Sequence, residues 1–375
     1  TLCQAGLAPK GLTSPDYAGF ANYGYHLDAG AFSVFLRQHC VDRLGVNHIA
    51  DTVTGVVPGK NGDIDAVETK GSGILAGDLF VDCTGFRALL LGQHYGVGLI
   101  SKSDVLFPDT ALAVQVPYEG GAAVQSATVA TAQPAGWIWD VSLSSRRGVG
   151  HVYSSRYMDE AAATDCIRVY LGMDETRFAE LPVRKLAIGS GYRETFWTHN
   201  CVAVGLSAGF LEPLEASALM LIETSANMIA DSIMSPSGTA AQTASLFNDS
   251  LHRIWEHIIE FLKLHYCLSE RAEPFWRDNR AAASLPPALA ADLRRWQHSV
   301  PGQDGSGAEG LVFPPASFQY VLYGMGRRIP VGAERLPPEL EAFGLQQMDT
   351  VSRTAARLQA MLPDNRTLLD ALNDV

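Results

Sequence analysis

The sequence of 375 residues lacks the features that mark several large classes of protein. It has 28 lysines and arginines against 40 acidic residues, which gives a formal charge of −12. Nucleic acids and anionic membrane surfaces bind clustered positive charge, so this balance argues against either partner. No apolar run approaches the roughly 18 residues that a membrane span needs. The six cysteines form no CxxC pair, so we expect no disulfide framework, no metal site and a cytoplasmic location.

What the sequence does have is apolar content and a changing periodicity. Apolar residues make up 47% of the chain, which is enough for a substantial core. Asp28 is the predicted N-cap of a helix whose apolar residues recur at helical spacing until Gly45. A strand-like run on each side of the turn at 59–63 predicts a hairpin, and the compact apolar run at 78–83 predicts a buried strand of a parallel sheet.

Two further regions complete the predicted fold. Residues 108–155 alternate apolar with polar or small residues, which predicts an antiparallel sheet of about four strands, with residues 145–150 as the turn before the last one. Beyond residue 235 the pattern is nearly all helix and loop, including an amphipathic helix over 247–266. We therefore predict an α/β fold, with a parallel sheet and an antiparallel layer in residues 1–235 and a helical region in residues 236–375.

Two segments that follow predicted strands have residues suited to ligand binding. Residues 82–85 (DCTG) let the backbone approach a ligand at the carboxyl edge of a sheet, although a plain tight turn has the same composition. Residues 205–217 (GLSAGFLEPLEAS) lead into a helix, whose free N–H groups favour an anion. Glu215 lies in or near its first turn; the alternative is that Glu212 and Glu215 only decorate the helix start. Ser207 also meets the G-x-S-x-G pattern of hydrolases, with no second motif in support.

A third segment, residues 136–141 (GWIWDV), carries two tryptophans on a predicted strand. Side chains at positions i and i+2 of a strand point to the same face, so Trp137 and Trp139 are expected side by side. Such a pair is either an aromatic cover over a core or a rigid wall beside a planar ligand.

In combination and in order, these segments resemble the flavin-dependent halogenases of the tryptophan-halogenase family, and the resemblance covers nearly all of the chain. The most specific parts are the GWIW and GLSAGFLEPLE stretches. The matching pieces are YHLDA (25–29), DLFVDCTGFRALL (78–90), GWIWDV (136–141), NCVAVGLSAGFLEPLEAS (200–217) and FLKLHY (261–266). The resemblance implies the fold of FAD-dependent aromatic monooxygenases with a mostly helical part on the substrate side.

The resemblance also implies an enzymatic activity and its site. Reduced FAD from a separate flavin reductase, oxygen and a halide ion would produce hypohalous acid, which halogenates a small aromatic substrate. Glu215 matches the active-site glutamate, and the backbone amides of Ser217 and Ala218 match the halide site. Trp137 and Trp139 match the wall between flavin and substrate. The positions that match contacts to FAD are Val53, Thr84, Gly85, Leu206 and Leu219.

Departures from the family pattern shape the remaining expectations. Ser317–Tyr320, with Phe318 and Tyr320 as substrate-side candidates, replaces the segment that clasps the amino acid in tryptophan-specific members. We therefore expect an indole-like or other electron-rich arene as substrate. The sequence leaves four points open: the identity of the substrate, the position that is halogenated, the preference for chloride or bromide, and the oligomeric state.

The first thirty residues contain neither the GxGxxG loop that binds the FAD pyrophosphate nor the family's catalytic lysine. The chain is thus expected to lack the family's first βαβ segment, as part of a longer active enzyme or, less favoured, as a non-catalytic truncated homologue. An FAD-dependent aromatic hydroxylase is the alternative activity.

Overall fold

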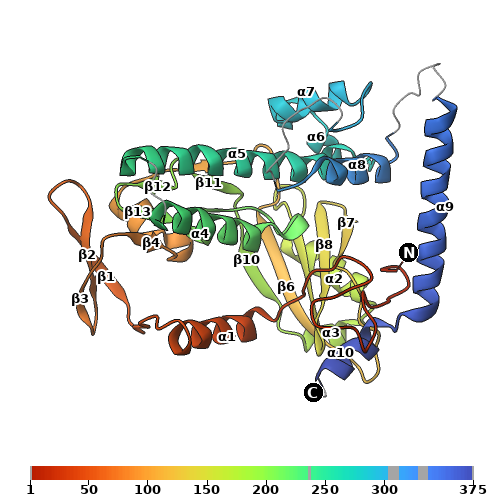
Figure 1. The fold of residues 1–375 in the computed structure, drawn as a ribbon, viewed down its shortest axis with the longest axis horizontal. Helices are drawn as coiled ribbons and strands as arrows, with labels where there is room; N and C mark the ends of the chain where they lie inside the picture. Colours follow the sequence, from red (N-terminus) through yellow and green to blue (C-terminus); the bar gives the residue numbers. More distant parts are fainter. Residues whose placement is uncertain (1, 235–237, 303–311, 328–336, 374–375) are drawn as a thin grey trace.

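The computed structural model describes residues 2–234, 238–302, 312–327 and 337–373, and combines four small sheets with helices packed around them (Figure 1). Helix α1 (Ala29–Asp42) begins where the sequence predicted, because the Asp28 carboxylate accepts hydrogen bonds from the N–H groups of Gly30 and Ala31. The predicted hairpin is confirmed and continues into a third strand. It comprises β1 (Val53–Pro58), β2 (Ile64–Thr69) and β3 (Gly73–Ala76), and it projects at the left of Figure 1.

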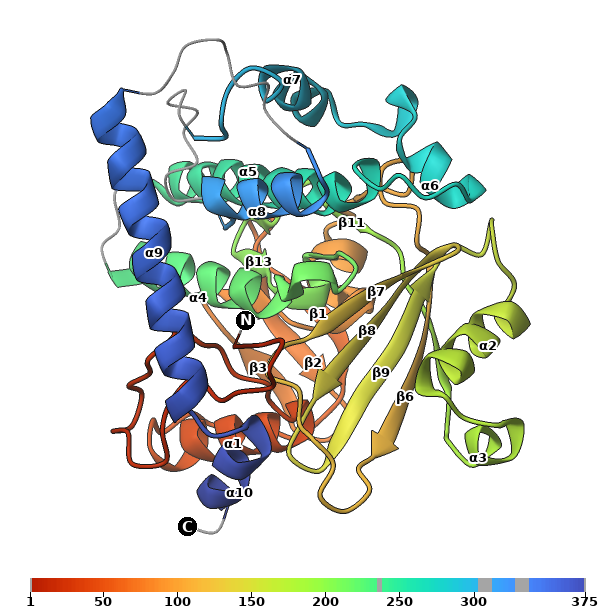
Figure 2. The same cartoon turned by 90° about the vertical axis from the view of Figure 1, so that its right-hand side faces the viewer.

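The predicted antiparallel layer is confirmed, with a fifth strand added. The strand order is β10-β6-β9-β8-β7, and every pairing is antiparallel. Helices α2 (Glu160–Leu171) and α3 (Glu175–Ala179) lie on one side of this sheet (Figure 2). The strands are β6 (Thr110–Pro117), β7 (Val129–Gln133), β8 (Gly136–Ser142), β9 (Arg146–Tyr153) and β10 (Arg184–Ala187).

The prediction of a turn at residues 145–150 is wrong. These residues belong mostly to β9, in which Arg147 pairs with Ser142 of β8. The Arg147 guanidinium donates two hydrogen bonds to the fully buried carboxylate of Asp140, which also accepts one from the hydroxyl of Tyr170. This ion pair and the backbone ladder hold a Gly- and Arg-rich segment extended that local turn chemistry alone would bend.

A parallel pair of strands carries the site at its carboxyl edge. Strand β4 (Phe80–Asp82) pairs in parallel with β13 (Cys201–Ala203), which pairs antiparallel with β12 (Trp197–Thr198). The expected parallel pairing of the strand at 78–83 is therefore confirmed, but its expected burial is wrong: Val81 is 45% exposed, and of β4 only Asp82 is buried. A further small sheet contains β5 (Leu99–Ser101), β11 (Gly191–Arg193) and β14 (Gly209–Phe210). Short helical turns η1 (Gly85–Arg87), η2 (Leu89–His94) and η3 (Gly205–Ser207) follow β4 and β13.

Helices dominate the second half of the chain, as predicted. Helix α5 (Ala240–Cys267) contains the predicted amphipathic segment and starts with a capping box between Thr239 and Gln242. Its apolar face is buried in the main hydrophobic core, which also contains residues of the sheets and of α4 (Ala218–Met234). The remaining helices are α6 (Pro274–Asn279), η5 (Ala282–Ser284), α7 (Pro287–Arg295), α8 (Pro315–Gly324), α9 (Pro338–Met361) and α10 (Asn365–Asn373).

The predicted boundary between residues 235 and 236 lies outside the described residues, so the division into two domains stays a prediction. Among the helices of the described ranges, none has both the length and the apolar content to cross a membrane.

Candidate active site

Glu215 lies on a strained turn in front of a helix. The sequence placed it in or near the first helical turn, but α4 begins only at Ala218, and Leu214–Ala216 form the short turn η4. Helix formation fails here because Glu215 (φ 64°) and Ala216 (φ 52°) are both in the left-handed region. Such a conformation costs on the order of 1–3 kcal/mol per residue and occurs most often where function requires it.

The Glu215 carboxyl group forms a close polar contact with His265 of α5. The ring atom Nε2 of His265 lies 2.9 Å from Oε1 of Glu215, and Nδ1 lies 2.9 Å from the carbonyl oxygen of Phe261. A carbonyl oxygen only accepts, so Nδ1 carries a hydrogen. The two contacts together fix the ring so that Nε2 faces the Glu215 carboxyl group.

The N-terminus of α4 lies two residues beyond Glu215. The Ser217 carbonyl accepts the first helical hydrogen bond, from the N–H of Leu221, so Ser217 occupies the N-cap. The N–H groups of Ser217 and Ala218 are among the first four of the helix, which have no carbonyl partner within it. Together with the dipole of a 17-residue helix, they suit an anion.

Trp137 and Trp139 lie on the same face of β8, as predicted, with ring centroids 6.2 Å apart and ring planes at 61°. The Trp139 ring lies directly across Gly150, its partner on β9. A Cβ at Gly150 would lie 2.1 Å from this ring, so only glycine leaves room for it. Trp137 is buried, and its indole Nε1–H donates a hydrogen bond to Glu212 Oε2 at 3.1 Å.

Glu212 differs from Glu215 in its surroundings. Its side chain is buried, and Oε2 also accepts a 2.6 Å hydrogen bond from the Tyr266 hydroxyl. Burial raises the pKa of Glu212 to about 7, against hydrogen bonds from Tyr266 and Trp137 that lower it. Glu215, by contrast, has a side chain that is 38% exposed. The two glutamates therefore lie in different surroundings, one buried and one partly exposed.

The DCTG segment and the GLSAG segment meet at the carboxyl edge of β4 and β13. The Ser207 hydroxyl lies 3.2 Å from Asp82 Oδ1 and 3.1 Å from the Gly85 carbonyl oxygen, and Ser207 is fully buried. This hydroxyl ties two loops together. Since it is inaccessible and faces acceptors other than a histidine among the described residues, Ser207 does not have the environment of a hydrolase nucleophile.

Four of the five residues matched to FAD contacts lie around this edge. Thr84 directly precedes η1, and Gly85 is its first residue. Turn η1 packs against η3, which contains Leu206. Turn η3 also contacts α4, and Leu219 is the second residue of that helix. Leu206 is 43% and Leu219 is 61% exposed, unusual for leucine in such a central position. Val53 begins β1 in a separate sheet.

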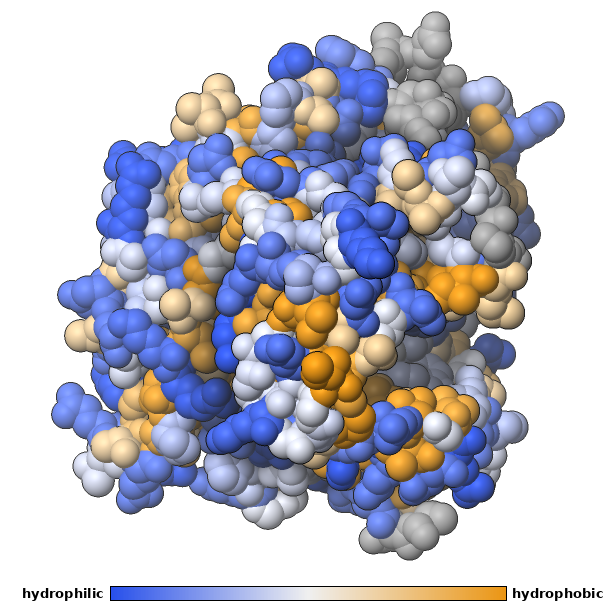
Figure 3. Space-filling view, turned by 90° about the vertical axis from the view of Figure 1, so that its left-hand side faces the viewer, coloured by the Kyte–Doolittle hydropathy of each residue, from blue (hydrophilic) through white to orange (hydrophobic). Residues whose placement is uncertain are grey.

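The backbone at this edge is open beside exposed apolar side chains. A Cβ added at Gly85 (φ 72°) would meet nothing within 4 Å, so the backbone there is open to a ligand. Exposed leucines beside open glycine backbone, at the carboxyl edge of parallel strands, are the surroundings that nucleotide cofactors use. The face at the left of Figure 1 likewise shows apolar side chains in several places among hydrophilic ones (Figure 3).

Comparison with known proteins identifies the family. The sequence profile described as "Tryptophan halogenase" matches residues 5–337. A curated relative, tryptophan 6-halogenase SttH of Streptomyces toxytricini, is 36% identical over 323 residues, which is 85% of this chain and 60% of that protein.

Solved structures agree. A tryptophan halogenase from Shewanella frigidimarina NCIMB 400 superposes with a TM-score of 0.93 at 43% identity, covering 98% of this chain and 70% of that one. BrvH, a flavin-dependent halogenase from Brevundimonas sp. BAL3, gives a TM-score of 0.85 at 30% identity, covering 99% and 74%.

The chain belongs to the tryptophan halogenase family. It spans 60% of the length of SttH, so family membership by itself does not assign the whole enzyme's activity to it. The flavin-monooxygenase-like fold predicted from the resemblance is confirmed by these structural neighbours.

The two substrate-side candidates on α8 lie in different surroundings. Phe318 is buried against Phe261, whose ring also contacts His265 at a centroid distance of 5.0 Å. Phe318 thus reaches Glu215 only through two intervening side chains. Tyr320 is 81% exposed, so the structure does not bring it together with Phe318.

The sequence did not point to three residues of the candidate site: His265 and Tyr266 fall only in an amphipathic helix, and Glu212 has no predicted role of its own. The available signal was the FLKLHY stretch at 261–266, which matched the family but received no function. The structure shows that its His265 and Tyr266 bond to Glu215 and Glu212, about 50 residues earlier.

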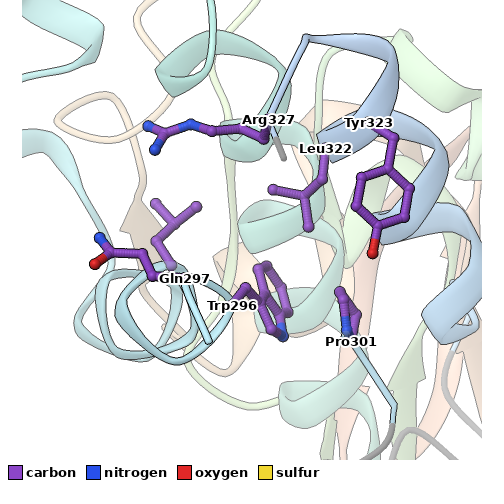
Figure 4. Close-up of a pocket in the computed structure, with 7 residues that line it drawn as sticks. Trp296, Gln297, Pro301, Leu322, Tyr323 and Arg327 are labelled. Carbon is purple, nitrogen blue, oxygen red and sulfur yellow. The ribbon is translucent and has the colours of Figure 1, made fainter. Parts of the chain in front are cut away.

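Two of the hollows in the described part of the chain lie away from this candidate site. One of roughly 40 Å³, between α7 and α8, has space for little more than a water molecule (Figure 4); it is lined by Leu293, Trp296, Gln297, Pro301, Leu322, Tyr323 and Arg327. A larger one of about 880 Å³ lies beside residues 2–28 and α10 and reaches β8 at Ser142. Ser142 is five residues from Trp137, about 17 Å along the strand, so this hollow is not part of the Trp137 wall.

Proposed function

We propose that the protein is a flavin-dependent halogenase that acts on an indole-like or other small electron-rich arene, using reduced FAD from a separate flavin reductase and a halide ion. The observation that carries the proposal is the Glu215 turn. It puts a carboxyl group that is in hydrogen-bond contact with His265 two residues before a helix N-terminus suited to an anion.

The chemistry of halogenation matches these groups. When bound, the reduced flavin supplies, with oxygen and halide, the hypohalous acid that carries the electrophilic halogen. The ring electrons of the arene form a carbon–halogen bond while the oxygen–halogen bond of the hypohalous acid breaks and releases hydroxide. The same ring carbon then loses its proton. The Glu215 carboxylate accepts this proton, while His265 holds the carboxyl group in position through Oε1.

The halide is expected at the start of α4. A protein with a formal charge of −12 repels anions overall, so it needs a local site to hold one. The N–H groups of Ser217 and Ala218 would provide such a site through their partial positive charge. Trp137 and Trp139 keep flavin and arene on opposite sides of a rigid aromatic wall.

The surroundings of α8 support a substrate without an amino acid group. SttH and the Shewanella protein are named for tryptophan, whereas BrvH is described only as a flavin-dependent halogenase. Here Phe318 is turned into the core and Tyr320 toward solvent, so these two do not form a common clasp for a charged backbone.

The test is a reductase-coupled reaction of the full chain with FAD, bromide or chloride, and indole or free tryptophan, read by mass spectrometry. The expected product is brominated or chlorinated indole, identified by its isotope pattern and absent without halide. Oxygen insertion that needs no halide would show a hydroxylase instead. Failure to bind FAD and to form any product would show a non-catalytic homologue, and a clear preference for tryptophan would refute the substrate assignment alone.

A further inference from the structure

We propose that Glu212 is a positioning residue for this site: its carboxyl group, anchored by Tyr266, holds the Trp137 indole in the orientation that the aromatic wall requires. This inference rests on the proposed function, because the aromatic wall separates flavin from arene only if the two bind on its opposite sides. The contact itself is independent of any activity.

The bond to Trp137 is the polar contact that fixes this indole. The ring is nearly surrounded by core residues, yet an indole in a core can still turn about its side-chain bonds unless a directional contact selects one rotamer. The Nε1–H···Oε2 bond at 3.1 Å supplies that direction. Trp139 contacts the Trp137 ring, so a change in one indole is transmitted to the other.

Glu212 is itself held rigidly. It follows β14, where a Cβ on Gly209 would lie 2.5 Å from the Gly191 carbonyl oxygen, so the backbone is tightly packed just before it. The Tyr266 hydroxyl bonds to the same oxygen at 2.6 Å. The Tyr266 ring is buried between Phe275 and Trp276, with centroid distances of 5.8 and 5.7 Å. The carboxyl group therefore connects Tyr266 of α5 to Trp137 of β8 and holds the indole in place.

A carboxyl group is a costly choice for this position. Its second oxygen, Oε1, is buried and has no hydrogen-bond partner among the described residues. An apolar side chain of similar size would fill the same space without the cost of desolvating a carboxyl group. A buried, incompletely bonded carboxyl three residues before Glu215 therefore points to a role at the site.

The charged groups around Glu212 do not neutralise it by direct contact. Lys263 on α5 is fully buried, and its Nζ bonds instead to the Val105 carbonyl oxygen and to Asn279 Oδ1. His265, also on α5, bonds to Glu215. Lys263 and His265 favour the charged form of Glu212, but burial outweighs them and raises its pKa to about 7. The bond to Trp137 is thus expected to strengthen as pH rises through neutrality.

The test follows the Trp137 indole N–H by nitrogen-15 NMR of the full chain, with Trp137→Phe to assign its resonance. In wild type the resonance should shift with pH near neutrality. Glu212→Gln keeps an oxygen acceptor of the same shape, so the bond should remain and the pH dependence should vanish. Glu212→Leu should move the resonance to that of an unbonded indole. Tyr266→Phe, the matched control, removes only the other donor and should leave the Trp137 bond in place.

A second experiment measures the amount of halogenated product formed per reduced flavin consumed. Glu212→Leu should lower this yield by about tenfold, the factor for loss of one hydrogen bond at the strong end of the neutral range. Glu212→Gln should restore most of it, and KM for the arene should change little. An unmoved Trp137 resonance in Glu212→Leu, or a moved resonance with full yield, would overturn the proposal. If wild type halogenates nothing, the proposed function fails, while the resonance still decides whether Glu212 holds the indole.

Discussion

Asp82 is predicted to contribute more to stability than any surface carboxylate, because it joins β4 to the two loops at the carboxyl edge of β4 and β13. It is fully buried and accepts five hydrogen bonds. Oδ1 accepts from Thr84 N–H (3.0 Å), Thr84 Oγ–H (2.6 Å) and Ser207 Oγ–H (3.2 Å), and Oδ2 accepts from Leu90 N–H (2.9 Å) and Leu91 N–H (2.8 Å). Asp82→Ala removes all five.

The magnitude follows from what is left without a partner. The N–H groups of Leu90 and Leu91 are buried, and each unpaired buried donor costs about 1–3 kcal/mol. The hydroxyl of Ser207 keeps its bond to Gly85, so it adds little. We therefore expect Asp82→Ala to lower the free energy of unfolding by about 2–6 kcal/mol, a large share of the roughly 5–15 kcal/mol typical of a domain.

Urea unfolding, followed by tryptophan fluorescence, measures this loss as a lower midpoint at unchanged slope. The exposed Asp78→Ala is the matched control and should stay within about 0.5 kcal/mol of wild type. Asp82→Asn, which keeps one oxygen acceptor, should fall between the two. A loss under about 1 kcal/mol in Asp82→Ala would refute the reasoning, since it would mean that the two leucine N–H groups find other partners.

The pH dependence has a definite sign. Burial raises the pKa of Asp82, but the hydrogen bonds from Thr84, Leu91 and Leu90 outweigh it and lower the pKa in the folded protein. The stabilisation is therefore present above the unfolded pKa of about 3.9 and is lost as the pH falls through the folded pKa. Wild type should lose more stability on acidification than Asp82→Ala does.

Three further predictions concern the site and the sheet beside it. Glu215→Gln should lower halogenation turnover by at least about tenfold, because it removes the proton acceptor, while the exposed Glu223→Gln should leave it unchanged; near-normal turnover in Glu215→Gln would contradict the assigned role. Arg147→Met should cost roughly 3 kcal/mol in urea unfolding, since it strands the buried Asp140, and the added change Asp140→Asn should recover part of this. Because the pKa of Glu212 in the folded protein is raised from 4.5 to about 7, the free energy of unfolding of wild type should fall as pH rises between these values, and that of Glu212→Gln should not. Equal pH dependence of the free energy of unfolding in the two proteins would contradict the raised pKa.

Local chemistry explains which parts of the structure could be predicted. The Asp28 cap depends on N–H groups two and three residues away, so sequence neighbours suffice. The Trp137 and Trp139 pair follows from the period of two in a strand. The error at residues 145–150 has the opposite origin. Arg- and Gly-rich residues favour a turn locally, but pairing with β8 and the bond to Asp140 keep them extended.

The helix start at Glu215 shows how tertiary packing overrides a local pattern. Leu214 to Met234 reads as one helix, and nothing in the composition predicts left-handed backbone at Glu215 and Ala216. This conformation costs free energy, so it persists only where surrounding contacts impose it, such as the bond from His265. Contacts of that kind join residues about 50 positions apart, beyond the reach of periodicity.

The sequence by itself determined the elements and the chemical inventory: the alternation of strands and helices, the paired tryptophans, the glutamates of GFLEPLE and the family resemblance. These depend on neighbours within a few positions, where propensity and periodicity act. Only the tertiary structure decided how the surroundings of the two glutamates differ. Glu215 is 38% exposed and in hydrogen-bond contact with His265, whereas Glu212 is buried between Trp137 and Tyr266. That difference arises because α5 packs across both, and burial and partner together set what a carboxyl group can do.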